Sequence, residues 1–310
     1  MSRLLDQAHD YLRLRRALGH NLDMAHRLLP DLVADLDAVG AATVTIDAAL
    51  AWAQRPEADP ATSVWARRIS VRGFARHMAG VDPRTEIPPV GLVTFRQRWR
   101  PPFIDSAADI TALLSAARRT IPTPMRTATV ETLVGLLAAT GMRVGEAIRF
   151  ERGDLNAAEG VIAVRQSKFG KSRLVPLHSS TRDVLADYIA RRNRFAVGRS
   201  VSSNVLVSSR GKRLHDRVVH ETFNALLRQI GLRGPSDSRG PRLHDFRHRF
   251  AVLTLLNWYR SGKDAERLLP ILSTYLGHVH VSDTYWYLQS WPELMREAMA
   301  RLERRWEEQP

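Results

Sequence analysis

The sequence of 310 residues has no cysteine. This absence excludes disulfide bonds, thiolate catalysis and cysteine-based metal sites, and it fits a cytoplasmic protein. Long apolar runs are missing too, because the longest, TLVGLLAATGM at 132–142, is too short to span a bilayer. The N-terminal residues MSRLLDQAHDYLRLRRALGH mix charged and apolar side chains, unlike the apolar segment of a signal peptide. The sequence therefore predicts a cytoplasmic protein without a membrane partner.

Acidic residues are scarce relative to basic ones. The chain has 46 Lys and Arg against 32 Asp and Glu, a net charge of +14, and its pI is about 11.0. Such an excess favours a polyanionic partner such as nucleic acid, with a solvated basic surface as the alternative. Residues 1–100 have 14 arginines, no lysine and 11 acidic residues, so they carry +3 and residues 101–310 carry +11. Most of the anion-binding capacity is expected in the second part.

The first 80 residues show the apolar periodicity of helices and no strand-like alternation. Four periodic segments predict a small helical unit, in which Gly40 ends the second helix. The fourth segment, near 61–80, carries Arg68, Arg72 and Arg76, and a spacing of four places them on one helix face. This face is either a ridge of DNA phosphate contacts or a solvated surface.

Residues 81–104 contain five prolines and no clear period, which indicates a linker. Arg96, Arg98 and Arg100 lie close together there and could follow a phosphate backbone. We therefore predict a helical DNA-binding domain at 1–92, a basic proline-rich linker at 93–104 and a second domain at 105–310.

The second domain has a mixed pattern. Helices are expected near 106–118, 126–139, from 143, and near 215–230, 244–258, 264–276 and 283–305. The stretch VIAVRQSKFGKSRLVPL at 161–177 predicts a β-hairpin, and NVLVSS at 204–209 a third strand. The expected fold class is mainly α with a small β-sheet (α+β).

Four stretches of this domain combine residues that carry chemistry. They are ATGMRVGEAIRF at 139–150, QSKFGKSRLVPL at 166–177, LHDFRHRF at 243–250 and LGHVHVSDTYWY at 276–287. Each alone has an ordinary interpretation: Arg143 could begin a helix beside Glu146, Lys168 could be a surface lysine, and His244 could cap a helix. His278 and Tyr287 could simply pack in the core.

Taken together, these stretches form an ordered set: an arginine, a hairpin lysine, a His-x-x-Arg, a Leu-Gly-His and a tyrosine nine residues later. The chain thereby resembles the tyrosine recombinase, or phage integrase, family. The resemblance covers roughly residues 105–290 as motifs, and the helical first unit resembles that family's core-binding domain, a SAM-like helical domain. It implies that a tyrosine hydroxyl attacks a DNA phosphodiester, which leaves a 3′-phosphotyrosyl link and a 5′-hydroxyl. Since bond energy is kept in this link, neither metal nor nucleotide cofactor is expected.

The resemblance assigns a role to each matching residue. Arg143 and Arg247 would clamp the scissile phosphate, because guanidinium groups compensate its developing charge. Lys168 would protonate the leaving 5′-oxygen, with Lys171 in the same turn as its rival. His244 would carry the proton of the tyrosine, and His278 would donate a hydrogen bond to the scissile phosphate. Tyr287 would be the nucleophile.

Neighbouring residues receive other roles. Tyr285 is the rival nucleophile, but two positions along a helix turn the side chain by about 200°, so both tyrosines cannot face one phosphate. The spacing from the Leu-Gly-His motif selects Tyr287. Within LHDFRHRF, His248 fits the family pattern as a structural residue, and Arg249 departs from it as an extra charge. Tyr275 is expected in the core.

The resemblance implies a site-specific DNA recombinase of a mobile element that acts in integration, excision or transposition. The ending YWYL…WPEL suggests a subgroup that occurs in elements encoding several recombinases. The expected partners are double-stranded DNA, further copies of the chain in a tetramer on DNA, and companion recombinases. A type IB topoisomerase shares the chemistry and is the main alternative. A non-catalytic DNA-binding regulator is the other.

Overall fold

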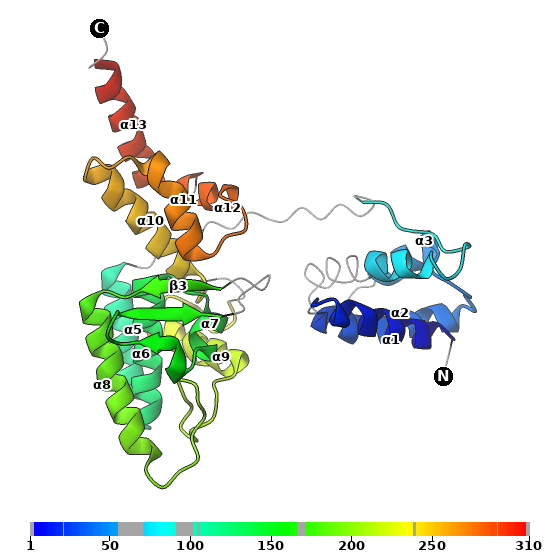
Figure 1. The fold of residues 1–310 in the computed structure, drawn as a ribbon, viewed down its shortest axis with the longest axis horizontal. Coiled ribbons are helices and arrows are strands. Elements are labelled where there is room, and N and C mark those ends of the chain that lie inside the picture. Colours follow the sequence, from blue (N-terminus) through cyan, green and yellow to red (C-terminus); the bar gives the residue numbers. More distant parts are fainter. Residues whose placement is uncertain are drawn as a thin grey trace. The chain divides into compact units, whose positions relative to one another are not determined.

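The computed structural model describes residues 3–20, 22–54, 71–90, 102–103, 106–165, 172–237, 240–289 and 291–307. The chain divides into two compact units, Met1–Trp99 and Arg100–Pro310 (Figure 1). This division falls inside the predicted linker 93–104, most of which lies outside the described residues. The predicted domain boundaries therefore stay a prediction.

The first unit is helical in its described part. It contains α1 (Arg3–Ala17), α2 (Asp23–Ala38), α3 (Ile46–Ala53) and a further helical segment at 71–78. Thr45 caps α3, since its hydroxyl accepts from the backbone N–H of Ala48. Their apolar faces meet around Leu29, Leu32, Trp52 and Phe74, which are almost fully buried.

Two of the three ridge arginines can be placed. Arg76 is exposed, whereas Arg72 is half-buried and donates a hydrogen bond to the backbone oxygen of Pro88. Arg68, Arg96, Arg98 and Arg100 lie outside the described residues. Of the predicted phosphate ridge, the structure therefore describes only Arg72 and Arg76. One N–H donor of Arg72 is already used by the protein.

The second unit is mostly helical around a small antiparallel sheet (Figure 1). Its helices before the sheet are α5 (Ala107–Thr120), α6 (Pro124–Thr140) and the short α7 (Val144–Arg149). The sheet runs in the order β1 (Leu155–Asn156), β2 (Val161–Val164) and β3 (Arg173–Pro176). After it come α8 (Ser179–Ala196), α9 (Asp216–Gln229), α10 (Asp245–Arg260), α11 (Ala265–Leu276), α12 (Ser282–Gln289) and α13 (Pro292–Glu307).

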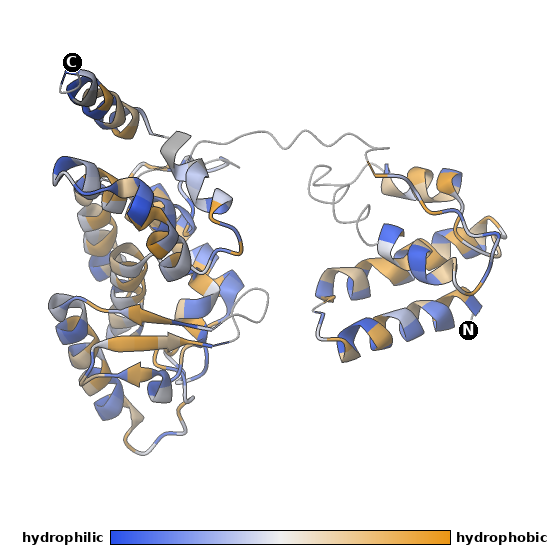
Figure 2. Cartoon of the chain, turned by 45° about the horizontal axis from the view of Figure 1, so that its top comes forward, coloured by the Kyte–Doolittle hydropathy of each residue, from blue (hydrophilic) through white to orange (hydrophobic). Residues whose placement is uncertain are grey.

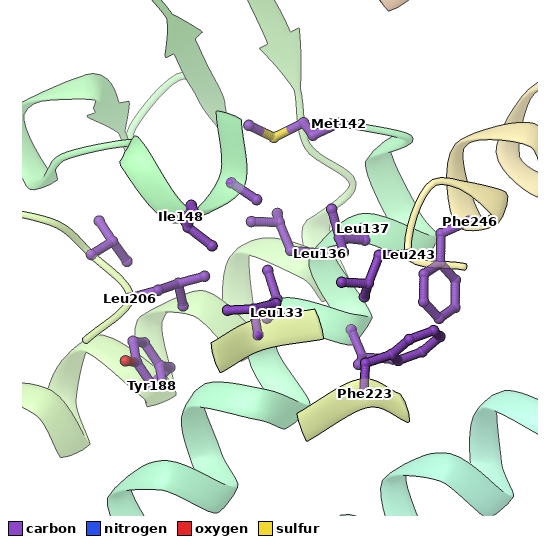
Figure 3. Close-up of a cluster of buried hydrophobic side chains, with 14 of the residues drawn as sticks. Leu133, Leu136, Leu137, Met142, Ile148, Tyr188, Leu206, Phe223, Leu243 and Phe246 are labelled. Atoms are coloured by element: carbon purple, nitrogen blue, oxygen red, sulfur yellow. The ribbon is translucent and has the colours of Figure 1, made fainter. Parts of the chain in front are cut away.

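The hydrophobic core of this unit joins α5, α6, α8 and α9 to the sheet. Leu133, Leu137, Ile148 and Phe223 are among its buried side chains (Figure 3). Figure 2 shows that apolar residues dominate the strands, which face this core. The register pairs Ile162 with Val175, both buried, so the inward side of the hairpin is covered by the core. This packing holds the base of the hairpin in place.

A second apolar cluster unites the C-terminal helices. Leu255, Leu272 and Leu276 pack with Tyr287 and Leu294, which brings α10, α11, α12 and α13 together. Apolar burial of this kind is the main force that fixes the helix ends carrying polar side chains.

The predicted fold class is confirmed: the chain is mainly helical with a small three-stranded sheet. Three details differ from the expectation. Helix α8 was not predicted, residues 204–209 form only isolated bridges through Asn204 and Val207, and the expected helix at 283–305 is two helices. Pro292 explains the last difference, since proline is favoured in a first helical turn and disfavoured inside a helix. Among the described residues, no helix is both long and apolar enough to cross a membrane.

Candidate active site

Turns and helix ends from distant parts of the second unit meet at one place. The segments are the α6–α7 turn, the start of α10, the α11–α12 turn and helix α12, and hydrogen bonds and ring contacts connect them. The structure thus brings together five of the six predicted catalytic residues: Arg143, His244, Arg247, His278 and Tyr287. The sixth, Lys168, and its rival Lys171 lie in the β2–β3 turn outside the described residues.

Arg143 stands at the turn between α6 and α7. Its Nη1 donates to Oε1 of Glu146 at 2.8 Å, and its Nη2 donates to the backbone oxygen of Gly277 at 3.2 Å. These bonds use two of the five N–H donors of a guanidinium. The side chain is 23% exposed. Arg143 is therefore held by the protein and still accessible to an anion.

Arg247 is an almost fully buried charged residue of the site, with 1% exposure. Nη1 donates to the backbone oxygen of Gly141 at 3.0 Å, and Nη2 donates to that of Leu276. Burial, followed by the charges of Arg143 and Arg173, lowers the pKa of Arg247 to about 10. The group stays charged at neutral pH, so a permanent cation is buried between the α6–α7 and α11–α12 turns.

Tyr287 lies beside this cation. Its side chain is 2% exposed, and burial raises the pKa of its hydroxyl above the ordinary value. The charge of Arg247, a hydrogen bond from it and the charge of Arg143 act in the opposite direction. At neutral pH the phenol is therefore protonated and needs a base before it can attack, while the arginines favour the phenolate that would form.

Three imidazole rings surround the tyrosine. His248 meets Tyr287 edge-on with ring centroids 5.3 Å apart, and His278 stacks on it at 5.9 Å. His244 contacts His248 at 4.8 Å. The Nδ1 of His278 is 2.8 Å from the hydroxyl of the buried Thr284, which fixes the ring. His248, predicted to be structural, thus lies between the predicted proton carrier and the predicted nucleophile.

The pKa values of all three histidines are lowered to about 4. Burial is the main cause, and nearby positive charge is the second. His244 remains exposed to solvent, yet protein atoms around its ring and the charges of His248 and Arg247 act in the same direction. Although His244 occupies the N-cap position of α10, its side chain makes no capping hydrogen bond. All three rings are neutral near pH 7 and able to accept a proton.

Lowering the pH from 7 to 5 should destabilise the second unit. The folded-state pKa of His248 is about 4, and an unfolded histidine has about 6.5. The contribution of His248 to the free energy of unfolding is complete above about pH 6.5. It is lost as the pH falls towards 4, because the unfolded chain then binds a proton that the folded chain does not. At about 1.36 kcal/mol per pKa unit, His248 alone should cost about 2 kcal/mol between pH 7 and 5.

Urea unfolding at both pH values measures this loss. The variant His248→Phe should show a smaller pH dependence than the unchanged chain, and His220→Gln, at a half-exposed histidine of α9, should show the same dependence. Equal pH dependence in His248→Phe and the unchanged chain would contradict the proposed burial of a neutral ring.

Two residues of the site were not predicted as functional. The buried Glu146 binds Arg143, and it also binds Arg173 through two bonds, Nη1–Oε1 at 3.0 Å and Nη2–Oε2 at 2.7 Å. Burial raises the pKa of Glu146, but the hydrogen bond and charge of Arg173 and the hydrogen bonds from Arg143 outweigh it and lower this pKa to about 2. The sequence signal was Glu146 three residues after Arg143, which indicated only an ordinary helix start.

Two glycines present their carbonyl groups to the arginines. Gly141 (φ +60°) accepts from Arg247, and Gly277 (φ +70°) accepts from Arg143. Both adopt the left-handed conformation that glycine tolerates best. A Cβ on Gly141 would lie 2.7 Å from Phe250, and one on Gly277 would lie 3.0 Å from the guanidinium of Arg173. The glycines of the ATGMR and LGH motifs thus allow the close approach that the site requires.

The rival and neighbouring residues have surroundings that differ from those of the predicted catalytic residues. Tyr285 is 49% exposed, in contrast to Tyr287, so the two tyrosines of α12 point to different environments. Tyr275 stacks on Phe250 in the apolar cluster, and burial raises its pKa to about 12. Arg249 is half-buried and lies one position beyond His248 on α10.

Two cavities lie in the second unit near this site. One of about 420 Å³ is lined by α6, α9 and residues 207–215. Another of about 310 Å³ is lined by Glu146, Arg149, Glu151, Asp154 and Arg165 among others, so it adjoins the buried carboxylate. In the described part of the chain, no cluster of three or more His, Asp or Glu side chains could hold a metal ion. The site as described places a partly exposed arginine and a buried arginine beside a buried phenol, an arrangement suited to a tetrahedral anion.

Comparison with known proteins identifies the family of the chain. The model of the phage integrase family matches residues 106–293. A putative integrase/recombinase of Sinorhizobium fredii, y4rB, is 50% identical over 314 residues and covers 99% of each chain. A second from the same organism, y4rE, is 34% identical, with 96% of this chain and 94% of the relative covered. The tyrosine recombinase XerD of Ralstonia nicotianae is 28% identical, over 82% of this chain and 77% of the relative.

Solved structures share the fold. The integrase of transposon Tn1549, in complex with transposon right end DNA, has a TM-score of 0.66 at 16% identity, with 96% of this chain and 98% of that chain covered. A lambda integrase dimer bound to a COC′ core site has a TM-score of 0.62 at 16% identity, with 93% and 77% covered. The matched family model and the close relatives establish that the chain belongs to the phage integrase family and is a tyrosine-type site-specific recombinase.

Proposed function

We propose that this recombinase cuts and rejoins DNA through a 3′-phosphotyrosyl intermediate with Tyr287 as the nucleophile. The observation that carries the proposal is the buried phenol beside Arg247, within reach of the charge of Arg143. Attack on a phosphodiester transfers the strand to the tyrosine oxygen and releases the 5′-oxygen, so the bond energy is kept for rejoining. The reaction needs no nucleotide or metal cofactor, because the arginines supply the positive charge.

In this proposal the arginines and the histidines have different roles in the reaction. Arg143 and Arg247 compensate the negative charge that grows on the non-bridging oxygens. His244, in ring contact with His248, removes the phenol proton, and His278 donates a hydrogen bond to the phosphate. Since Tyr287 is buried, DNA reaches its hydroxyl only after the side chains that cover it have moved.

Lys168 is the proposed general acid for the leaving 5′-oxygen. A 5′-bridging sulfur in the scissile bond is a much better leaving group and needs no proton. Lys168→Ala should therefore be severely slow on normal DNA and largely rescued by the sulfur. Arg143→Ala should not be rescued, because its charge acts on the non-bridging oxygens. Single-turnover rates on both substrates measure this, with Lys171→Ala as the matched control, and equal rescue of the Arg143 variant would refute the assignment.

DNA binding is proposed to involve both units and the linker. Arg68, Arg72 and Arg76 would contact phosphates from the first unit, and Arg96, Arg98 and Arg100 from the linker. Changing the first three to alanine should flatten the slope of log affinity against log salt by up to about three units, at roughly 0.9 per lost contact. The cleavage position should stay the same, because phosphate contacts do not read sequence. A salt titration of DNA binding tests this, and an unchanged slope would make these arginines a solvated surface.

Assembly of several copies on DNA is part of the proposal, because strand exchange needs two cut duplexes. A lambda integrase tetramer bound to a Holliday junction is among the similar structures. Leu294 of α13 and the preceding Trp291 pack against the chain's own cluster. On the same helix, Met295, Met299, Leu302 and Trp306 are exposed. We propose that this second face contacts a neighbouring copy, so Met299→Glu should reduce the mass of the protein–DNA complex in light scattering.

The biological role proposed is integration, excision or transposition of a mobile element. It is supported by relatives described as integrase/recombinase and by the fold shared with a transposon integrase. The gene's flanking sequences test it, because a mobile element has defined ends.

The experiment that tests the proposed function traps the intermediate. Random duplexes are incubated with the full chain in excess EDTA, the reaction is stopped with detergent, and strands attached to protein are recovered and sequenced. We expect one enriched sequence, the selected duplex, with a covalent protein adduct at its 3′ end and a free 5′-hydroxyl. An adduct only in the presence of magnesium would indicate different chemistry. DNA binding without an adduct would instead favour a regulator, and relaxation of supercoils without exchange a topoisomerase.

A further inference from the structure

The carboxylate of Glu146 is shared by two arginines. Arg173 binds both of its oxygens in a fork, at 3.0 and 2.7 Å, while Arg143 uses one N–H of its side chain on Oε1 at 2.8 Å. The backbone N–H of Arg143 donates to Oε2 at 3.0 Å. The side chain of Glu146 is 2% exposed and that of Arg173 is 8% exposed, whereas that of Arg143 is 23% exposed. The two-bond contact with Glu146 is thus made by Arg173 and not by the more exposed Arg143.

The charges explain why the second arginine matters. If Arg143 were the sole partner of the buried carboxylate of Glu146, the carboxylate would neutralise its charge. The pair would then offer a phosphate almost no net charge. Arg173 adds one positive charge, so the three groups together carry +1. The low pKa of Glu146, about 2, agrees with a carboxylate that is ionised and fully compensated.

Arg173 also connects the segments that carry the predicted catalytic groups. It begins β3, where it pairs with Val164 of β2, at the base of the hairpin whose turn contains Lys168. Its Nε donates to the backbone oxygen of Tyr275 at 2.7 Å, two residues before Gly277. Arg143 donates to the backbone oxygen of Gly277 in the same turn at 3.2 Å. One guanidinium therefore ties the hairpin, α7 and the end of α11 together.

We infer that Arg173 is a positioning residue for DNA cleavage, which takes up the charge of Glu146 so that Arg143 keeps its own charge for the scissile phosphate. This inference rests on the proposed function, and it assigns a role to a residue that contacts no reacting atom. Its consequence is specific: loss of Arg173 should act through the charge of Glu146, and removal of that charge should relieve the loss.

The test is a double-mutant cycle with the full chain and the selected duplex. Arg173→Met keeps an apolar stem but no charge, and it should slow single-turnover cleavage by roughly 100-fold, a loss that about 1 Å of misplacement can cause. Adding Glu146→Gln to Arg173→Met should recover at least roughly tenfold, since coupled neighbours are non-additive. Affinity for the duplex should change little. Arg192→Met, at a buried arginine that binds the backbone oxygens of Ser202 and Asn204, controls for the loss of a buried guanidinium.

A substrate with a neutral scissile linkage gives a rate ratio that a purely structural role of Arg173 would not change. A methylphosphonate at the scissile position replaces one charged oxygen by a methyl group, so less positive charge is required. The ratio of the unchanged chain's rate to that of Arg173→Met should shrink at least roughly tenfold on this substrate, because the interaction that was lost acts on phosphate charge. The same ratio for Arg192→Met should not change.

The outcomes separate this inference from the proposed function. Rescue by Glu146→Gln together with the smaller ratio on methylphosphonate supports the inference. Cleavage by Arg173→Met within a factor of about three of the unchanged rate overturns it, and so do additive losses in the cycle with an unchanged ratio. In both of these cases the unchanged chain still forms its adduct, so the proposed function stands. Absence of any adduct from the unchanged chain overturns both.

Discussion

Replacing Arg247 by lysine should slow cleavage of the selected duplex by a factor of roughly 10³–10⁵, the range that a single arginine contributes in other phosphoryl-transfer enzymes. Lysine keeps the charge but loses the planar group that donates to Gly141 and Leu276 at once and that, in the proposed mechanism, also binds the phosphate. The expected loss is large because this side chain is both the buried cation next to Tyr287 and the link between two turns of the site. Single-turnover cleavage at saturating protein measures it.

A matched variant distinguishes chemistry from folding. Arg192 is also an almost fully buried arginine that donates to two backbone oxygens, those of Ser202 and Asn204. Both Arg192→Lys and Arg247→Lys leave buried acceptors less well satisfied, at about 1–3 kcal/mol each. Urea unfolding should therefore give similar losses of stability, while only Arg247→Lys loses cleavage. Equal losses of cleavage in two folded variants would mean that Arg247 acts only in the fold.

The motifs of the candidate site could be recognised in the sequence because each lies within one short segment. The structure brings five of the six predicted residues together, and their catalytic roles stay a prediction. His244 and Arg247 are three positions apart, and the structure confirms the expected helix there, with His244 at the N-cap of α10 and Arg247 in its first turn. The helices of the first unit followed from their apolar period, and Gly40 (φ +66°) ends the second as expected. In each case the information lies within one turn or one helix.

The partners of these residues were not predictable. Arg173 is 27 positions from Glu146, and the contact exists because the hairpin folds back onto α7. Nothing within either segment shows that contact. Likewise, the bond from Arg72 to Pro88 depends on how residues 79–88 return past the helical segment. Pairing between segments is set by tertiary packing, which periodicity does not describe.

The errors in secondary structure have the same origin. Residues 204–209 have the apolar composition of a strand, and Val205, Leu206 and Val207 are fully buried. They nevertheless pair only through isolated bridges, since β1 rather than this segment completes the sheet. Burial in a core favours the same residues as a sheet does, so composition alone does not separate the two.

The choice between two tyrosines tests the central claim most directly. Tyr287 is buried beside Arg247 and the rings of His248 and His278, whereas Tyr285 on the same helix is half-exposed. The chemical step needs a phenol that is held next to positive charge and a proton acceptor. The surroundings of Tyr287 provide both.

The measurement is covalent adduct formation on the selected duplex by the unchanged chain, Tyr287→Phe and Tyr285→Phe, with DNA affinity determined in parallel. Tyr287→Phe should form no adduct while it binds DNA almost normally, because only the nucleophilic oxygen has been removed. Tyr285→Phe should form the adduct at close to the unchanged rate. An adduct that persists in Tyr287→Phe and disappears in Tyr285→Phe would contradict the assignment of the nucleophile and the site built around it.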